Sequence, residues 1–154
     1  MSKASVPLLG AVLMVGLTVL LAGVVTVAVT GLGPRSSAPQ VALEVSADAA
    51  TGQVTLEHVS GPPLDVRRVT LTVEVDGEAL AHQPPVPFYA AEGYSGFPSG
   101  PFNPAADPAW SAGETASFRV AATTNEPPLT AGAELTVTVV RDDQLVARAT
   151  TTVA

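Results

Sequence analysis

Few residues in this chain have the types and spacing that catalysis or metal binding requires. The two histidines, His58 and His82, stand apart from any His-x-x-x-His pattern, and the chain has no cysteine. Each histidine is interpreted as a surface or hydrogen-bonded strand residue. The acidic runs Asp76-Gly77-Glu78 and Asp142-Asp143 fall in turn sequences, where carboxylates commonly cap backbone groups. The spaced ligands of a calcium loop, a nucleophile elbow and a phosphate-binding loop are all missing. The sequence therefore predicts no enzyme, no metal site and no cofactor.

The charge of the chain is strongly acidic beyond its first 40 residues. All 14 acidic side chains lie between Glu44 and Asp143, against five arginines and no lysine, a net charge of −9. Two interpretations stay open: adaptation to a salty exterior, where salt screens the repulsion, or a moderately acidic extracellular domain from a genome that favours Arg over Lys. Nucleic acid is excluded as a partner, because phosphate backbones are bound through basic patches.

An apolar N-terminal segment precedes this acidic part and is the candidate for its membrane anchor. No charged side chain occurs from Ser5 to Pro34, and residues 8–29 are nearly all apolar. A helix over residues 8–30 would be about 34 Å long, enough to cross a hydrocarbon layer of about 30 Å. Three interpretations compete: a cleaved secretory signal, a permanent membrane span, or a pilin helix that leaves the membrane for a filament core. The segment is longer than a secretory h-region of about 7–15 residues, which disfavours the first.

Residues 41–154 are predicted to form strands. Apolar residues alternate with polar or small ones over residues 41–45, 54–56, 69–75 and 135–139, which is the pattern of half-buried strands. Asp76-Gly77 predicts a hairpin, and further strands are predicted at residues 86–90, 115–121 and 145–153. About seven or eight short strands without helices favour one antiparallel β-sandwich of immunoglobulin-like size, following a single N-terminal hydrophobic α-helix.

An irregular segment, residues 83–113, contains seven prolines and six of the seven aromatic residues of the chain. One interpretation is a long loop ordered by its own aromatic cluster. The other is an exposed aromatic surface for subunit contact or adhesion, because aromatic side chains are enriched at interfaces. Both can hold for different rings. The candidate interface residues are Phe88, Tyr89, Tyr94, Phe97, Phe102 and Trp110.

The first residues resemble those of archaeal type IV pilins. Lys3-Ala4 directly precedes the apolar run that begins Ser5-Val6-Pro7-Leu8, and in this family a basic and a small residue stand before the hydrophobic helix. The resemblance implies a class III signal peptide that prepilin peptidase cuts between Ala4 and Ser5. Residues 54–61, 64–65 and 110–114 look like segments that recur in halophilic archaeal pilin-like proteins.

This resemblance implies a leader (1–4), a transmembrane or filament-core helix (5–31), a Gly/Pro/Ser linker (32–40) and an extracellular sandwich (41–154). The N-terminus would stay cytoplasmic, as the charge of Lys3 favours. The implied partners are membrane lipid, sister pilins, prepilin peptidase and the pilus machinery. The alternative is a membrane-tethered β-sandwich binding module that never polymerises.

Small residues in the helix form stripes along which helices can approach closely. Gly16, Gly23 and Thr30 recur every seven residues, and Ala22, Thr26 and Thr30 every four. The stripes indicate helix packing, although glycine is also common in membrane helices in general.

Overall fold

The computed structural model describes residues 5–30 and 40–154, with side chains described at 6–21 and 40–154. The chain divides into two compact units, Met1–Ser37 and Ala38–Ala154. The predicted leader and most of the linker lie outside the described residues. The first unit contains one helix, α1 (Ser5–Thr30). Pro7 is tolerated in its first turn, because the amides there have no helical acceptor.

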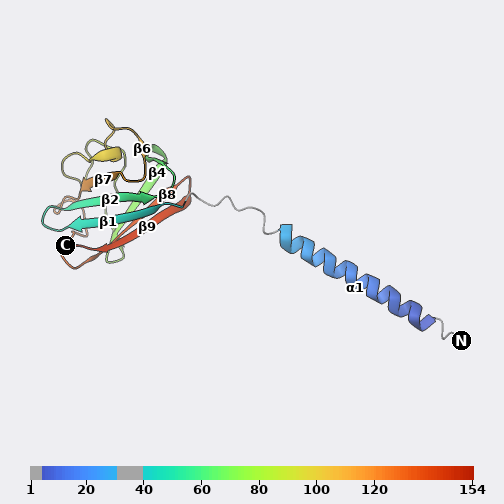
Figure 1. The fold of residues 1–154 in the computed structure, drawn as a ribbon. Coiled ribbons are helices and arrows are strands. Elements are labelled where there is room, and N and C mark those ends of the chain that lie inside the picture. Colours follow the sequence, from blue (N-terminus) through green and yellow to red (C-terminus); the bar gives the residue numbers. More distant parts are fainter. Residues whose placement is uncertain (1–4, 31–39) are drawn as a thin grey trace. The chain divides into compact units, whose positions relative to one another are not determined.

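The second unit is a β-sandwich of two main sheets around one core (Figure 1). The three-stranded sheet has the order β1 (Ala42–Asp48), β2 (Gln53–Ser60), β7 (Thr115–Arg119). The four-stranded sheet has the order β5 (Glu78–Ala79), β4 (Val69–Val75), β8 (Glu134–Arg141), β9 (Gln144–Thr152). All these pairings are antiparallel, so the predicted fold class, a helix followed by an antiparallel sandwich, is confirmed.

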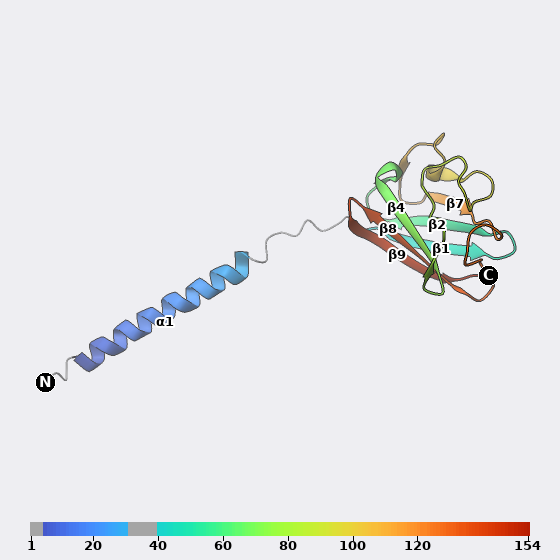
Figure 2. The ribbon, with the colours of Figure 1, turned by 180° about the vertical axis from the view of Figure 1, so that it is seen from behind.

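The connectivity distributes successive hairpins over the two sheets. The chain passes from the first sheet to the second between β2 and β4, returns at β7 and leaves again at β8 (Figure 2). This Greek-key route is typical of immunoglobulin-like sandwiches. A small third ladder joins β3 (Leu64–Asp65) to β6 (Ala109–Trp110), and short 3-10 helices occupy η1 (Val66–Arg68) and η2 (Gly100–Phe102).

The core consists of the inward residues of the alternating strands. Val54 and Leu56 of β2 and Leu71 and Val73 of β4 are all buried in one hydrophobic cluster. Burying such side chains is the main favourable term for a domain without disulfides. The other strands contribute Ala116, Phe118, Leu135, Val137 and Val139.

The last residue of the chain closes one side of the sandwich. The backbone N–H of Ala154 donates to the carbonyl of Ala47, and the N–H of Ala49 donates to the carbonyl of Ala154, both at 2.9 Å. This is the bonding pattern of parallel neighbours. It joins the end of β1 to the segment that continues β9.

The predicted turn at residues 76–77 is confirmed. Asp76 and Gly77 both have positive φ, 50° and 79°, as a tight hairpin turn requires. The carboxylate of Asp76 accepts a hydrogen bond from the N–H of Glu134 at 2.9 Å. The acidic turn residue thus caps backbone, as expected from the sequence.

The strand predicted at residues 86–90 is wrong. Pro84, Pro85 and Pro87 have no N–H to donate to a ladder, and this part of the chain is irregular. The backbone of Val73 in β4 is paired instead by a side chain. The amide of Gln83 accepts from the N–H of Val73 at 2.7 Å and donates to its carbonyl at 3.0 Å.

Candidate functional site

The helix α1 presents large apolar side chains that its own unit does not cover. Leu9, Leu13 and Met14 are among the many exposed apolar residues between Val6 and Leu21. A Cβ placed on Gly16 would meet no atom within 4 Å, so this position leaves room for a close neighbour. For the other packing residues, Ala22, Gly23, Thr26 and Thr30, the side chains lie outside the described ones. The packing stripe stays a prediction.

No helix among the described residues reaches the length and hydropathy of a membrane span. The processing residues Lys3 and Ala4 lie outside the described residues, and Ser5 is the first residue of α1.

Four of the six aromatic residues of the 83–113 segment order that segment. Their rings form a continuous chain with Phe118 of β7, in the order Phe88, Tyr94, Phe118, Phe102 and Trp110. The centroid distances lie between 5.2 and 6.2 Å, in the range of favourable aromatic pairs. Phe88, Phe102 and Trp110 are buried and Tyr94 is half-buried, so these rings hold the loop against the sandwich.

The other two aromatic residues are exposed. Tyr89 is 54% and Phe97 75% exposed, which makes Phe97 the most exposed of the large apolar side chains described in the β-domain. Of the six predicted interface residues, these two present their rings at the surface.

His58 differs from its predicted role. Its side chain is fully buried in β2, with its ring centroid 5.7 Å from that of Trp110. Neither ring nitrogen has a hydrogen-bond partner among the described residues. The imidazole is therefore neither at the surface nor hydrogen-bonded. The backbone of His58 is paired, since its N–H donates to Glu114 and its carbonyl accepts from Gly113.

Residues 54–61, 64–65 and 110–114, the three domain segments singled out in the sequence, meet in space. Leu64 pairs with Trp110 across β3 and β6, and the indole N–H of Trp110 donates to the carbonyl of Glu114 at 3.0 Å. The ring of His58, from the first segment, lies against the same indole. This cluster lies toward the end of the sandwich where the chain enters, because a Cβ on Gly61 would lie 2.7 Å from the carbonyl of Gln40.

His82 is anchored through its backbone. The buried amide of Asn125 accepts from the N–H of His82 and donates to its carbonyl, both at 2.9 Å. The phenol of Tyr94 donates to the same carbonyl at 2.7 Å, and burial raises the pKa of this phenol. The imidazole of His82 lies 3.7 Å from the carboxylate of Glu92. Across the described parts of the chain, no three His, Asp or Glu side chains are grouped to hold a metal.

A bulge beside β7 carries Phe97. The N–H of Ser95 donates to the carbonyl of Arg119, and that of Ser99 donates to the carbonyl of Ser117, both at 2.9 Å. Between these bonds, three residues of the loop lie opposite one residue of β7, and Gly96 has a positive φ of 69°. Bulges of this kind re-aim side chains.

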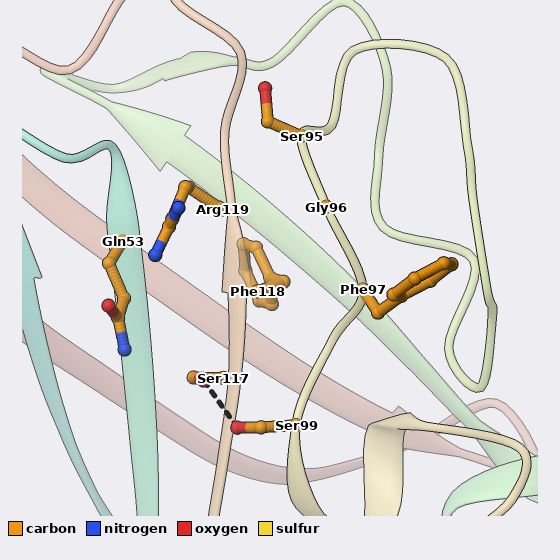
Figure 3. A pocket seen from close by; sticks show the side chains of 8 residues that line it. All are labelled: Gln53, Ser95, Gly96, Phe97, Ser99, Ser117, Phe118 and Arg119. Atoms are coloured by element: carbon orange, nitrogen blue, oxygen red, sulfur yellow. Dashed lines mark hydrogen bonds between the residues drawn. The ribbon is translucent and has the colours of Figure 1, made fainter.

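The bulge borders an open depression of about 280 Å³ (Figure 3). The side chains of Gln53 and Arg119 lie next to each other in it, while the ring of Phe97 points away from them. Arg119 is exposed, and its side chain makes no hydrogen bond or ion pair with the described residues.

A second depression, of about 240 Å³, is lined mainly by prolines. The guanidinium of Arg67 lines it as well and forms a two-pronged ion pair with Asp65, with N–O distances of 2.9 and 2.7 Å. Hydrogen bonds from Arg67 lower the pKa of Asp65 to about 2. We call this depression the proline pocket; its other lining residues are Pro87, Pro101, Asn103, Pro104, Ala106 and Pro108.

Comparison with known protein families gives a match at the N-terminus. Residues 6–43 match the family model described as "Archaeal Type IV pilin, N-terminal", which covers α1, the following segment and the start of β1. No curated protein matches the chain. The resemblance read from the N-terminal sequence is therefore confirmed over residues 6–43, where the chain is similar to the N-terminal segment of archaeal type IV pilins.

Proposed function

We propose that the chain is a structural subunit of a cell-surface type IV filament, made as a membrane-anchored precursor. The observation that carries this proposal is the pilin match over residues 6–43, on a segment that has no charged side chain from Ser5 to Pro34. A helix that is apolar all round is stable in lipid or against copies of itself, because water would expose its whole surface.

In this proposal the precursor spans the membrane once, with Lys3 in the cytoplasm and the β-domain outside. Prepilin peptidase removes Met1 to Ala4 and leaves Ser5 as the first residue. The assembly machinery then draws α1 out of the lipid into a core of sister helices, where Gly16, Gly23 and Thr30 allow close approach. The β-domains coat the filament and serve adhesion.

The mature N-terminus tests the processing step. Mass spectrometry of the chain from membranes should give Ser5 as the first residue, and deletion of the peptidase should restore the four leader residues. Ala4→Phe should block the cut, whereas the matched variant Ala4→Gly keeps a small residue and should be processed normally. An unprocessed chain in wild-type cells would overturn the proposed processing.

Shearing of the cell surface tests the assembly step. The processed chain should appear in the sheared fraction as filaments visible by electron microscopy. A chain that begins at Met1 or Ser2 and stays in the membrane fraction would instead support the tethered binding module. A secreted chain that begins near Gln40 would contradict both functions.

A further inference from the structure

We propose that Phe97 of one subunit inserts into the proline pocket of a second copy of this chain. This inference rests on the proposed function and assigns the lateral contact between β-domains in the filament. It follows from an exposed ring, a pocket with mainly proline walls and the charges around each.

The local backbone holds the ring of Phe97 at the surface. The ring stands on a bulge whose two ends are fixed by hydrogen bonds to β7, and the positive φ of Gly96 turns the chain there. This ring is 75% exposed, so it lacks the stabilisation that four other aromatic residues of the segment gain from burial. Rings of this kind are the usual anchors of protein interfaces.

The proline pocket has the size and chemistry for such a ring. Its volume is about 240 Å³, whereas a cavity of about 150 Å³ admits a benzene molecule. The pyrrolidine rings of Pro87, Pro101, Pro104 and Pro108 give apolar walls that lose little side-chain entropy when they are covered. Phe97 does not line this pocket in its own domain. A Phe97 ring that enters the pocket therefore belongs to another copy.

The charges around the two surfaces are complementary. Arg119, which shares the depression beside Phe97, has no ion-pair partner among the described residues. The proline pocket is flanked by Asp65 and by Asp107, which stands between Ala106 and Pro108 and is close enough to raise the pKa of Arg67. Asp65 pairs with Arg67, and Arg68, which also acts on Asp65, pairs with Asp142, so the charge of Asp107 leaves this side acidic. In a domain of net charge −9, the approach of a free arginine to an acidic rim lowers the repulsion between copies.

The geometry of the contact suits a filament. The ring and the pocket are different surfaces of one domain, so a contact between them is head-to-tail rather than self-complementary. Such heterologous contacts extend into open helical assemblies when the rotation between copies does not close.

The first experiment compares Phe97→Ala with Tyr89→Ala in cells. Tyr89 is also an exposed aromatic of the 83–113 segment but lines neither depression, which makes it a matched control. We expect Phe97→Ala to lower the ratio of sheared to membrane-bound subunit by about tenfold or more, the effect of losing an interface anchor, and Tyr89→Ala to change it by less than about twofold. Filaments of Phe97→Ala at wild-type yield would overturn the inference while leaving the proposed function intact.

The second experiment uses the absence of cysteine from the chain. Ser95→Cys combined with Ala106→Cys keeps the Phe97 ring and places one thiol beside it and one in the pocket. Mild oxidation of sheared filaments by a copper-phenanthroline oxidant should then give a ladder of covalent multimers, whereas either single variant should give no species beyond a dimer. Filaments that form without a ladder would overturn the contact. If the wild-type chain forms no filaments at all, the proposed function fails instead.

Discussion

His58 shows how one buried polar side chain can limit the stability of a domain. Its imidazole is fully buried against Trp110, and neither ring nitrogen has a partner among the described residues. Each buried polar atom without a partner costs about 1–3 kcal/mol. The sequence held a signal for this position, because Val54, Leu56 and His58 alternate in β2 and therefore share the inward face.

We expect His58→Leu to stabilise the β-domain by about 1 kcal/mol, because it removes an unpaired polar group at similar volume. Denaturant unfolding followed by the fluorescence of Trp110 measures the change. His82→Leu, at a partly exposed ring, serves as the control and should shift the midpoint little. A loss of stability in His58→Leu would show that the imidazole has a polar partner such as a buried water molecule.

The ion pair of Asp65 predicts how stability changes at low pH. The pKa of Asp65 is lowered from 3.8 to about 2 by hydrogen bonds from Arg67, so the carboxylate form is favoured in the folded state. The stabilisation from this pair is therefore fully present above pH 3.8 and is lost as the pH falls through 2. An NMR titration of the Asp65 carboxyl should give the lowered value, and Arg67→Gln should return it toward 3.8. An unchanged pKa in Arg67→Gln would contradict the assigned cause.

At the scale of elements, the 83–113 segment buries some of its aromatic residues in the core and exposes others to solvent. Phe102 is fully buried between Trp110 and Phe118, whereas Phe97 is mostly exposed. We expect Phe102→Ala to cost about 3–5 kcal/mol of unfolding free energy, as for other buried aromatic residues. Phe97→Ala in the same segment should cost less than about 0.5 kcal/mol. Equal losses in thermal or denaturant unfolding would show that Phe97 also supports the fold.

The elements that the sequence predicts well are those whose faces differ in burial. In β4 and β8, alternate residues enter the core, so the period of two appears directly in the sequence. The strand prediction for residues 86–90 is wrong because their apolar content outweighed Pro87, which cannot donate to a ladder, and the two prolines just before it. The cap that Gln83 places on β4 depends on tertiary geometry and leaves no periodic signal.

The candidate site follows the same division. The N-terminal resemblance was visible in consecutive residues, from Lys3 through the apolar run. The separation of Phe97 from Phe102 was not, because both are phenylalanines next to a proline in one irregular segment. The contacts of Phe102 with Trp110 and Phe118 in the folded chain show that this ring is the buried one. The sequence likewise gives no signal for Arg119, whose place beside the bulge is visible only in the fold.

At the scale of the molecule, the acidic charge predicts a dependence on salt. With 14 acidic and five basic side chains after residue 40, self-repulsion opposes folding at low ionic strength. About 1 M salt shortens the screening length to roughly 3 Å, so the unfolding temperature should rise between 0.1 and 1 M KCl. Replacing the exposed Glu44, Glu57 and Glu78 by Gln should reduce that rise. A salt-independent unfolding temperature would favour the moderately acidic extracellular domain over adaptation to a salty exterior.

The attachment of β1 has a mechanical consequence. A pull on the helix reaches the sandwich at Gln40, so β1 is the first strand to carry the load. It is held by seven register pairs with β2 along one edge, and by the backbone of Ala154 near its far end. A pull along the direction of β1 would load these hydrogen bonds together, whereas a pull across the strand would break them one after another.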